Sequence, residues 1–261
     1  MPETMQTWKI SDIYQHSDTL KSFFLPVQLQ ANAGQFVMIW IPGVDEKPFA
    51  ISGTNASGIE ITVKAIGKFT NAMMQLKKND WLGVRGPFGN TFQLSDNSII
   101  VGGGCGNAPL KYLAQILKKN NFNFKWIAAA KTRDDIPFRN EMNEKEFWYP
   151  MTQDGSYGKS GIATEPLKEM LLQKKPSVIY GSGPEPMLLA VRQIAKEHQI
   201  PVQLSFERYM KCGIGICGQC CLDGNGIRLC IEGPILNEEA MAGVTEWGLP
   251  HRGPSGKRIS V

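Results

Sequence analysis

Hydrophobic and polar residues in the first third of the chain alternate as they do in short, half-buried β-strands. The clearest case is residues 59–64, where apolar and polar side chains take turns. Glycine and proline cluster between such runs. Short strands at this spacing predict a small antiparallel β-barrel over residues 1–95, with one short helix at 70–76. Its other strands are expected at residues 19–25, 35–41, 49–52 and 81–85.

From about residue 96 the pattern changes to apolar strands that alternate with helical spacings. In the first helix, Leu110, Leu113, Ala114 and Leu117 recur at i, i+3, i+4 and i+7. This order predicts an α/β domain with a parallel sheet over residues 96–206. Strands are expected at residues 99–101, 124–129, 178–180 and 202–206, with further helices at 167–171 and 187–194.

Composition indicates an ordinary globular protein, because 42% of the 261 residues are hydrophobic and 20% are charged. The net charge of +4 is small and the basic residues are scattered, which argues against nucleic acid or a membrane as partner. The sequence shows no bilayer-spanning apolar run and no secretory signal at its start. We therefore expect a cytoplasmic location, where clustered cysteines bind metal or do redox work more often than they form disulfides.

Five of the six cysteines fall within nineteen residues. Cys212, Cys217, Cys220 and Cys230 have the C-x4-C-x2-C…C spacing that is typical of plant-type 2Fe-2S ferredoxins. Glycines between these candidate ligands allow a tight loop that brings backbone N–H groups near the sulfurs, where they stabilise negative charge. Residues 207–261 are therefore predicted to be a small iron–sulfur module.

Two other interpretations of the cysteines stay open, namely a structural zinc site and unligated thiols. A zinc site would more naturally use two C-x2-C pairs, or cysteine with histidine, and the histidine within the cysteine-bearing segment 207–261 is His251. Cys221 directly follows Cys220, so its side chain should point elsewhere. Cys105 lies far away in the sequence and is expected to be a small filler residue.

Residues 102–109, Gly-Gly-Gly-Cys-Gly-Asn-Ala-Pro, follow an apolar strand and open a helix. Glycines let the backbone approach a phosphate, and the helix N-terminus supplies N–H groups and the positive end of its dipole. Pro109 stands where a Rossmann fingerprint would carry its third glycine, although proline suits a first helical turn. The alternative is a plain tight turn. The candidate nucleotide contacts are Gly103, Gly104, Gly106, Asn107, Ala108 and Pro109.

A second glycine-bearing turn, residues 180–187, also joins an apolar strand to a helix. Two such strand ends in one parallel sheet should face the same crevice. A third segment, residues 152–156, is either part of this site or a surface loop. These two segments add the candidates Asp154, Gly155, Ser182, Gly183, Pro184 and Met187.

Together these segments resemble the ferredoxin–NADP reductase superfamily over most of the chain. In that family a barrel binds flavin and a following α/β domain binds a pyridine nucleotide. The resemblance rests on the sequences at residues 86–89, 102–109 and 183–187. With the terminal cysteines and the segment 154–158, the chain resembles the electron-transfer subunits of type B dihydroorotate dehydrogenases.

The resemblance implies that the barrel binds FAD. The family motif Arg-Pro-x-Ser corresponds to Lys47-Pro48-Phe49-Ala50, so a lysine point charge replaces the arginine fork and Ala50 replaces a hydroxyl residue. Thr70 is expected to begin the short helix, as an N-cap and near the FAD pyrophosphate. The implied flavin contacts are Lys47, Pro48, Phe49, Ala50, Thr62, Val63, Lys64, Phe69 and Thr70.

The resemblance also implies a function and a partner. Nicotinamide would exchange a hydride with FAD, and the 2Fe-2S cluster would carry single electrons. The partner would be an FMN-containing subunit that oxidises dihydroorotate to orotate in pyrimidine biosynthesis, with NAD+ as final acceptor, in a heterotetramer of two plus two subunits. Alternatives are a reductase subunit of a hydrogenase or of a ferredoxin:NAD(P) transhydrogenase, and a zinc-stabilised nucleotide-binding regulator.

The choice between NAD(H) and NADP(H) stays open in the residues. Arg133 could meet a 2′-phosphate, or it could be solvated or pair with Asp134 or Asp135. The resemblance favours NAD(H). Ser182 stands where many members of the family carry a cysteine before the Gly-Pro of this turn.

No side chain is expected to act as a catalyst. The proposed relay needs no general acid or base, and no catalytic residue is predicted. The histidines His16, His198 and His251 are interpreted as surface residues. The tail over residues 252–258 is expected to be loose.

Overall fold

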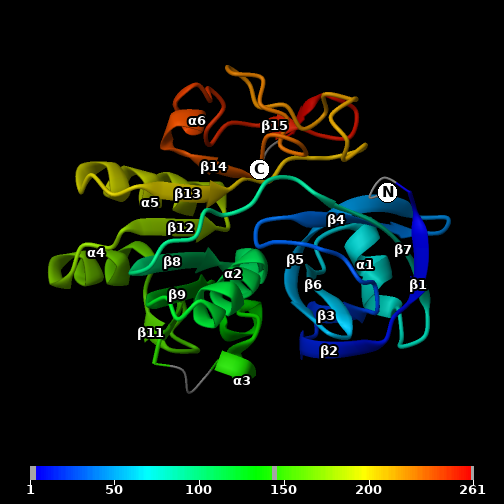
Figure 1. The fold of residues 1–261 in the computed structure, drawn as a ribbon, viewed down its shortest axis with the longest axis horizontal. Coiled ribbons are helices and arrows are strands. Elements are labelled where there is room, and N and C mark those ends of the chain that lie inside the picture. Colours follow the sequence, from blue (N-terminus) through cyan, green and yellow to red (C-terminus); the bar gives the residue numbers. More distant parts are fainter. Residues whose placement is uncertain (1–3, 143–145, 260–261) are drawn as a thin grey trace.

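A barrel-like antiparallel sheet and a parallel α/β sheet lie side by side, and the C-terminal segment lies across one end of both (Figure 1). The structure is a computed structural model that describes residues 4–142 and 146–259. The predicted order of a barrel domain, an α/β domain and a terminal cysteine-bearing segment is confirmed.

The barrel-like sheet has the strand order β1-β7-β4-β5-β6-β3-β2, with antiparallel neighbours throughout. The strand predicted at residues 59–64 is confirmed as β6, but it is not half-buried: Ile61 and Val63 lie in the barrel core, and Glu60 and Thr62 between them are buried as well. On the opposite face Glu60 forms an ion pair with Lys111 of the next domain. The elements are β1 (Gln6–Lys9), β2 (Asp12–Ser17), β3 (Leu20–Leu25), β4 (Phe36–Ile41), β5 (Asp45–Asn55), β6 (Gly58–Lys64), α1 (Lys68–Gln75) and β7 (Trp81–Phe88).

The second sheet has the order β11-β10-β9-β8-β12-β13-β14, and its strands are parallel except β14. Strands β8 and β12 are neighbours, so the two glycine-bearing turns that follow them open at the same edge. The elements are β8 (Ser98–Gly103), η1 (Gly104–Gly106), α2 (Asn107–Lys119), β9 (Phe124–Ala130), η2 (Arg133–Asp135), α3 (Arg139–Met142), β10 (Trp148–Thr152), β11 (Lys159–Ser160), α4 (Thr164–Gln173), β12 (Val178–Ser182), α5 (Glu185–Glu197) and β13 (Val202–Ser205).

The cysteine-bearing segment is joined to both domains. Its strand β14 (Ile235–Asn237) pairs antiparallel with β13, so the second sheet continues past the boundary predicted at residue 207. At the end of the barrel, the Asn90 carboxamide donates to the carbonyls of Glu232 and Ile235 and accepts from the Ile235 N–H, at 2.7–2.9 Å. The segment is thus anchored by backbone pairing on one side and by one side chain on the other.

The tail is ordered, which corrects the expectation that residues 252–258 are loose. Helix α6 (Glu238–Ala242) is followed by a small hairpin of β15 (His251–Arg252) and β16 (Arg258–Ile259). Arg252 and Arg258 both bind the Asp223 carboxylate. The tail therefore clamps the cysteine-bearing loop through charge pairs that the local sequence pattern does not reveal.

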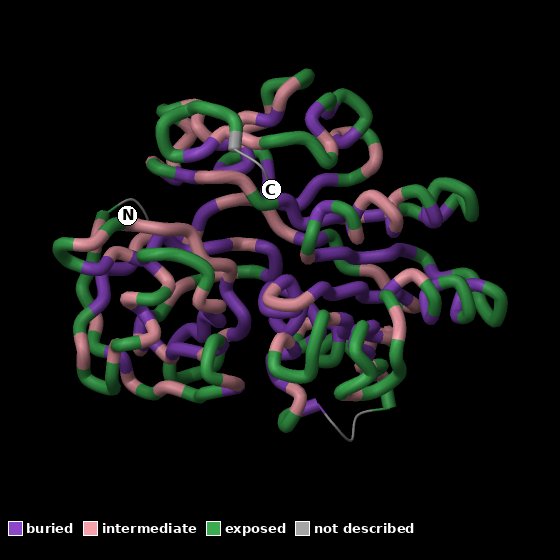
Figure 2. Tube along the Cα trace, turned by 180° about the vertical axis from the view of Figure 1, so that it is seen from behind, coloured by how far each residue is buried: buried purple, intermediate pink, exposed green. Residues whose placement is uncertain are grey.

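Two clusters of buried side chains hold these parts together, and buried segments follow the strands of both sheets (Figure 2). One cluster joins the barrel interior to the α2 face of the second sheet. The other lies on the α4 and α5 face and includes Leu222, Leu229 and Phe88. Each cluster thus crosses a predicted domain boundary. Within the described ranges, no helix is both long and apolar enough to cross a membrane.

Candidate functional site

A cleft of about 660 Å³, here called the barrel cleft, opens between the barrel and the second domain. Most of the predicted flavin contacts lie in its wall. The exception is Val63, whose side chain is fully buried in the barrel interior. Helix α1 and strands β5 and β6 bring together Lys47, Pro48, Phe49, Ala50, Thr62, Lys64, Phe69 and Thr70.

The chemistry of the barrel cleft combines aromatic surface with positive charge. The rings of Phe49 and Phe69 stack with their centroids 5.9 Å apart. Lys47 binds Asp45 and donates to the Tyr209 hydroxyl at 3.0 Å. Burial alone would lower the pKa of Lys47, but these two partners raise it, so the ammonium stays charged. An apolar wall with a few placed charges suits a flat cofactor that bears phosphates.

Thr70 lies in the barrel cleft but does not begin helix α1, which starts at Lys68. Its hydroxyl accepts from the N–H groups of Ile66 and Gly67 and donates to the Gly67 carbonyl. The expected N-cap role is therefore wrong, because the threonine holds the preceding turn from inside the helix.

A second cleft, of about 650 Å³ and here called the sheet cleft, lies at the carboxyl edge of the parallel sheet. Both predicted glycine turns reach it. A Cβ atom on Gly106 would lie 2.5 Å from the Gly183 backbone, so the two turns touch where only glycine fits. The predicted residues in the wall are Gly103, Gly104, Gly106, Gly183, Pro184 and Met187.

Some predicted nucleotide contacts lie elsewhere. Asn107 is fully buried, where it donates to the Gly104 carbonyl and accepts from the Trp126 indole, so it shapes the turn instead of facing the cleft. Ser182 is 1% exposed and is not in the wall. The remaining four differ in place: Ala108 and Pro109 line the barrel cleft, while Asp154 and Gly155 are exposed outside the walls of both clefts.

The wall between the two clefts is shared. Five residues line both of them, and sequence reasoning missed the three that follow β13, because no motif marks the chain where it leaves the last parallel strand. The shared residues are Lys64, Cys105, Phe206, Glu207 and Arg208. A ligand in either cleft would thus lie next to a ligand in the other.

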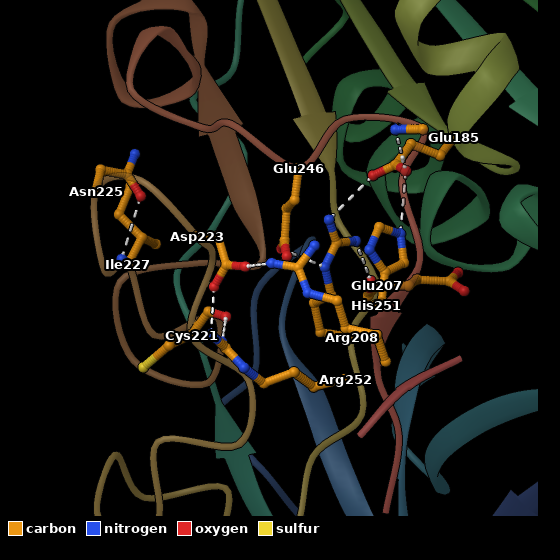
Figure 3. A network of polar contacts seen from close by, with 12 residues as sticks. Glu185, Glu207, Arg208, Cys221, Asp223, Asn225, Ile227, Glu246, His251 and Arg252 are labelled. Carbon is orange, nitrogen blue, oxygen red and sulfur yellow. Dashed lines mark hydrogen bonds and ion pairs between the residues drawn. The ribbon is translucent and has the colours of Figure 1, made fainter. Parts of the chain in front are cut away.

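Arg208 is the centre of a buried charge network (Figure 3). Its side chain is 5% exposed and donates to Glu246 at 2.9 Å and to Glu185 at 3.1 Å. Glu185, the first residue of α5, also lies 3.0 Å from His251 Nε2. The network therefore connects the sheet cleft, the chain that leads to the cysteines, and the C-terminal tail.

Two of the three histidines are not surface residues, contrary to the prediction. His251 is in the network just described. His16 is 8% exposed, and burial, followed by the charges of Lys111 and Arg139, lowers its pKa to about 4. His198 is exposed as expected.

The four predicted metal ligands form two pairs. The thiols of Cys212 and Cys217 interact by a hydrogen bond, as do those of Cys220 and Cys230, and all four cysteines are free. The hydrogen bond from Cys230 is the main cause that lowers the pKa of Cys220 to about 6. Burial works against ionisation of Cys212, but backbone N–H groups lower its pKa to about 7. Cys212 and Cys220 can thus ionise near neutral pH, whereas the hydrogen bond to Cys220 and burial raise the pKa of Cys230.

The backbone around these pairs fits a cluster. Gly213, Gly215 and Gly218 have φ values of 71°, 77° and 67°, a left-handed conformation that favours glycine. The Gly215 N–H donates to the Cys230 sulfur at 3.2 Å. Two cysteine pairs fit two irons that take two thiolates each, and the four residues between Cys212 and Cys217 differ from the C-x2-C pair typical of zinc. Within the described ranges, no three Cys, His, Asp or Glu side chains converge as ligands of a single ion.

The other two cysteines are placed differently. Cys221 forms an isolated antiparallel β-bridge with Arg228, and this bridge turns the chain back so that Cys230 meets Cys220. Burial raises the pKa of the Cys221 thiol. Cys105 lies in the wall shared by the two clefts, and burial raises its pKa to about 12, so it stays protonated. Its exclusion from the ligand set stays a prediction.

Comparison with known proteins adds independent support. Residues 207–242 match the family model for the iron–sulfur cluster binding domain of dihydroorotate dehydrogenase B. The chain is 40% identical over 252 residues, 96% of each chain, to the probable dihydroorotate dehydrogenase B (NAD(+)), electron transfer subunit, of Methanocaldococcus jannaschii. The corresponding protein of Methanothermobacter thermautotrophicus is 38% identical over 99% of this chain and 97% of its own.

Solved structures agree with this assignment. A chain of an NADH-dependent reduced ferredoxin-NADP oxidoreductase has a TM-score of 0.82 and 26% identity, over 92% of this chain and 90% of its own. A ferredoxin NADP+ reductase from Neisseria gonorrhoeae with bound FAD and NADP shares the fold, with a TM-score of 0.63 and 18% identity over 74% of this chain and 91% of its own. The chain therefore belongs to the family of dihydroorotate dehydrogenase B electron transfer subunits, which have a ferredoxin–NADP reductase-like fold and an iron–sulfur binding domain.

Proposed function

We propose that the chain relays electrons between a partner FMN dehydrogenase and NAD+, with a 2Fe-2S cluster at the cysteine pairs and FAD in the barrel cleft. The observation that carries this proposal is the wall of five residues common to the two clefts. Neighbouring clefts allow a nicotinamide and a flavin ring to lie in contact. When bound, the cofactors supply the redox chemistry, whereas the protein supplies their positions.

In the barrel cleft, Phe49 and Phe69 would provide apolar surface for FAD. Lys47, held by Asp45 and Tyr209, would face its phosphates as a point charge. Lys64, paired with Asp135, would stand where flavin and nicotinamide meet. Together these residues would hold the ring between the two domains.

In the sheet cleft, the close turns at Gly106 and Gly183 would admit the pyrophosphate of NAD(H). At the N-terminus of α5 the Glu185 N–H is left to face the ligand, because Pro184 and Pro186 have none and the Met187 and Leu188 N–H groups donate to the Pro184 carbonyl. Arg133 is exposed and outside the cleft wall, while Asp134 pairs with Arg139. We prefer NAD(H) because the similar proteins are described as NAD(+) enzymes.

At the other end, Cys212, Cys217, Cys220 and Cys230 would hold the cluster, with Gly215 N–H directed at sulfur. Tyr209 lines the barrel cleft, and two residues, Met210 and Lys211, separate it from Cys212 in the sequence. The cysteine loop thus follows the flavin wall directly in the chain. This proximity suits single-electron exchange between flavin and cluster.

We infer a partner from the family. The similar proteins are electron transfer subunits of dihydroorotate dehydrogenase B, so the partner of this chain would be the FMN-containing catalytic subunit that oxidises dihydroorotate to orotate in pyrimidine biosynthesis. We further propose an assembly of two copies of each subunit. The test is co-purification of the two chains, followed by an assay of NAD+ reduction that depends on dihydroorotate.

A second candidate is a reductase subunit of a ferredoxin:NAD(P) transhydrogenase, favoured by the similarity to the NADH-dependent ferredoxin-NADP oxidoreductase. The same assay separates the two. Dihydroorotate-dependent NADH formation with the co-purified partner supports the first proposal. Activity with reduced ferredoxin and NADP+, together with none from dihydroorotate, contradicts it and supports the second.

A further inference from the structure

A chain of buried hydrogen bonds runs through the barrel wall to the barrel cleft. His16 Nε2 lies 2.9 Å from Ser22 Oγ, which lies 2.9 Å from Thr62 Oγ1. Ser52 Oγ donates to the same Thr62 oxygen at 2.9 Å. These four side chains are 0–8% exposed, and of the four only Thr62 lines the cleft.

The direction of these bonds follows from His16. The Phe138 N–H donates to His16 Nδ1 at 3.3 Å, so Nδ1 carries a lone pair and Nε2 carries the hydrogen of the neutral ring. Nε2 therefore donates to Ser22, and the Ser22 hydroxyl is left to donate to Thr62. Thr62 then accepts two bonds, and its own hydrogen has no acceptor in the described part of the chain.

The start of the chain is fixed by the second domain. Phe138 has a φ of 63°, a left-handed conformation that bulky residues avoid, and it presents its N–H to the ring. Its own ring packs edge-on against His16 with centroids 5.1 Å apart. Arg139 donates to the His16 carbonyl at 2.6 Å. Burial, with the charges of Lys111 and Arg139, keeps His16 neutral by lowering its pKa to about 4.

On the barrel side of this cleft, Thr62 and Thr70 carry the hydroxyls of the wall. The motif position where the superfamily carries a serine or threonine is Ala50. The Thr70 hydroxyl already donates to the Gly67 carbonyl. Ser205 and Tyr209, at and after the end of β13, carry the other hydroxyls of the cleft, and Tyr209 accepts from Lys47. On the barrel side, Thr62 thus offers the hydroxyl hydrogen that no bond in the described part of the chain uses.

We propose that Thr62 donates a hydrogen bond to an electron-rich atom of the flavin ring, and that His16 and Ser22 are positioning residues that hold this donor in place. The inference rests on the proposed binding of FAD in the barrel cleft. A fixed donor stabilises the reduced, more electron-rich flavin more than the oxidised one, so it raises the flavin midpoint potential.

The experiment measures FAD content, the visible spectrum and the flavin midpoint potential of the purified holoprotein and its variants. Thr62→Val keeps the branched shape without the donor and should shift the redox equilibrium about tenfold toward oxidised flavin, about 30 mV for two electrons. Ser22→Ala should shift it in the same direction by less. Thr62→Ser should restore the wild-type potential. Ser98→Ala, which removes a buried hydroxyl that lines neither cleft, should leave the potential unchanged.

Each outcome decides one point. A shift in Thr62→Val without a shift in Ser22→Ala shows that Ser22 and His16 do not position the donor, which overturns that part. No shift in either variant, with FAD retained, overturns the whole inference. A wild-type protein that binds no FAD contradicts the proposed function itself, and this inference fails with it.

Discussion

The two clefts and the cysteine loop are built in different ways. The sheet cleft lies at the ends of paired strands, and the turns after β8 and β12 are fixed by a continuous backbone ladder. Between β13 and β14 the chain has no helix or strand beyond the Cys221–Arg228 bridge, although this stretch is fully described. In this stretch, glycine turns and side-chain contacts such as those of Asn90 and Arg252 hold the chain in place of strand pairing.

This difference implies that the clefts should depend on the sheets for their shape, whereas the cysteine loop should depend on its side-chain contacts and on the cluster. The clefts inherit their shape from the sheets, so we expect them to survive loss of the cluster. The cysteine loop owes its shape to a few contacts and to the proposed cluster, because ligand binding and local folding are coupled at such sites. The following predictions separate the two regions.

The largest effect is expected from a change that damages only the cysteine loop. Cys220→Ser should abolish iron and sulfide binding. Electron transfer to the partner should fall by more than about 100-fold, because losing only a hydrogen-bond partner of a metal ligand already costs roughly 10–100-fold. FAD content and NADH-dependent flavin reduction should remain. Iron analysis and parallel assays measure this. Cys221→Ser is the matched control, and equal loss of iron in both variants would refute the ligand set.

A smaller but global effect is expected at the junction of the two regions. Arg208→Met leaves Glu246 as a buried, uncompensated carboxylate and leaves Glu185 with only His251 and the Gly248 N–H as partners, so the free energy of unfolding should fall by about 3–5 kcal/mol. Denaturant titration measures it. Arg192→Met is the control, because its pair with Glu238 is more exposed and should contribute at most about 1 kcal/mol. Similar losses in both variants would show that the Arg208 network is not special.

A pH effect should be confined to the barrel side. The pKa of His16 is about 4 in the folded protein and about 6.5 when unfolded, so below pH 6.5 the unfolded chain binds a proton that the folded one does not. The stability is present in full above pH 6.5 and falls as the pH drops toward 4, by about 1–3 kcal/mol. His16→Phe should flatten this dependence in thermal melts between pH 7 and 4. If stability depends on pH as steeply in His16→Phe as in the wild type, a group other than His16 takes up the proton.

The smallest effect is expected within the sheet cleft. Gly106→Ala forces the two glycine turns apart, and strain of this kind costs roughly 1–3 kcal/mol, so the Kd for NADH should rise about tenfold. Fluorescence titration with NADH measures it, and the iron content should not change. Gly256→Ala in the tail hairpin is the control: its Cβ meets no atom within 4 Å, and the strain of its left-handed φ of 79° lies outside the wall of the sheet cleft, so the Kd should not change. Wild-type affinity in Gly106→Ala would show that the close approach does not shape the site.

The sequence predicted the regular parts of the molecule well. Alternation and helical spacing located most strands and the three longer helices, because burial on one face leaves a periodic trace. It missed β1 and β2 at the start of the barrel, β10, which contains Pro150 and no clear alternation, and β14, which is only three residues long. It began helix α1 two residues late, because Thr70 is typical of an N-cap yet here bonds back to the turn.

The site was predicted only where a local motif marks it. The glycine turns and the cysteine spacing carry their chemistry in consecutive residues. Phe206, Arg208 and His251 carry no such mark, since their role comes from contacts between segments far apart in the chain. Asn107 shows the converse, because a residue inside a motif can support the backbone instead of facing the ligand.

The most direct test of the relay is the absorption spectrum of anaerobically purified protein, with iron and sulfide analysis, before and after NADH is added. We predict overlapping flavin and iron–sulfur bands, about two irons and two sulfides per chain as in a 2Fe-2S cluster, and bleaching of both chromophores by NADH. A colourless protein, or one that contains only zinc, would contradict the account.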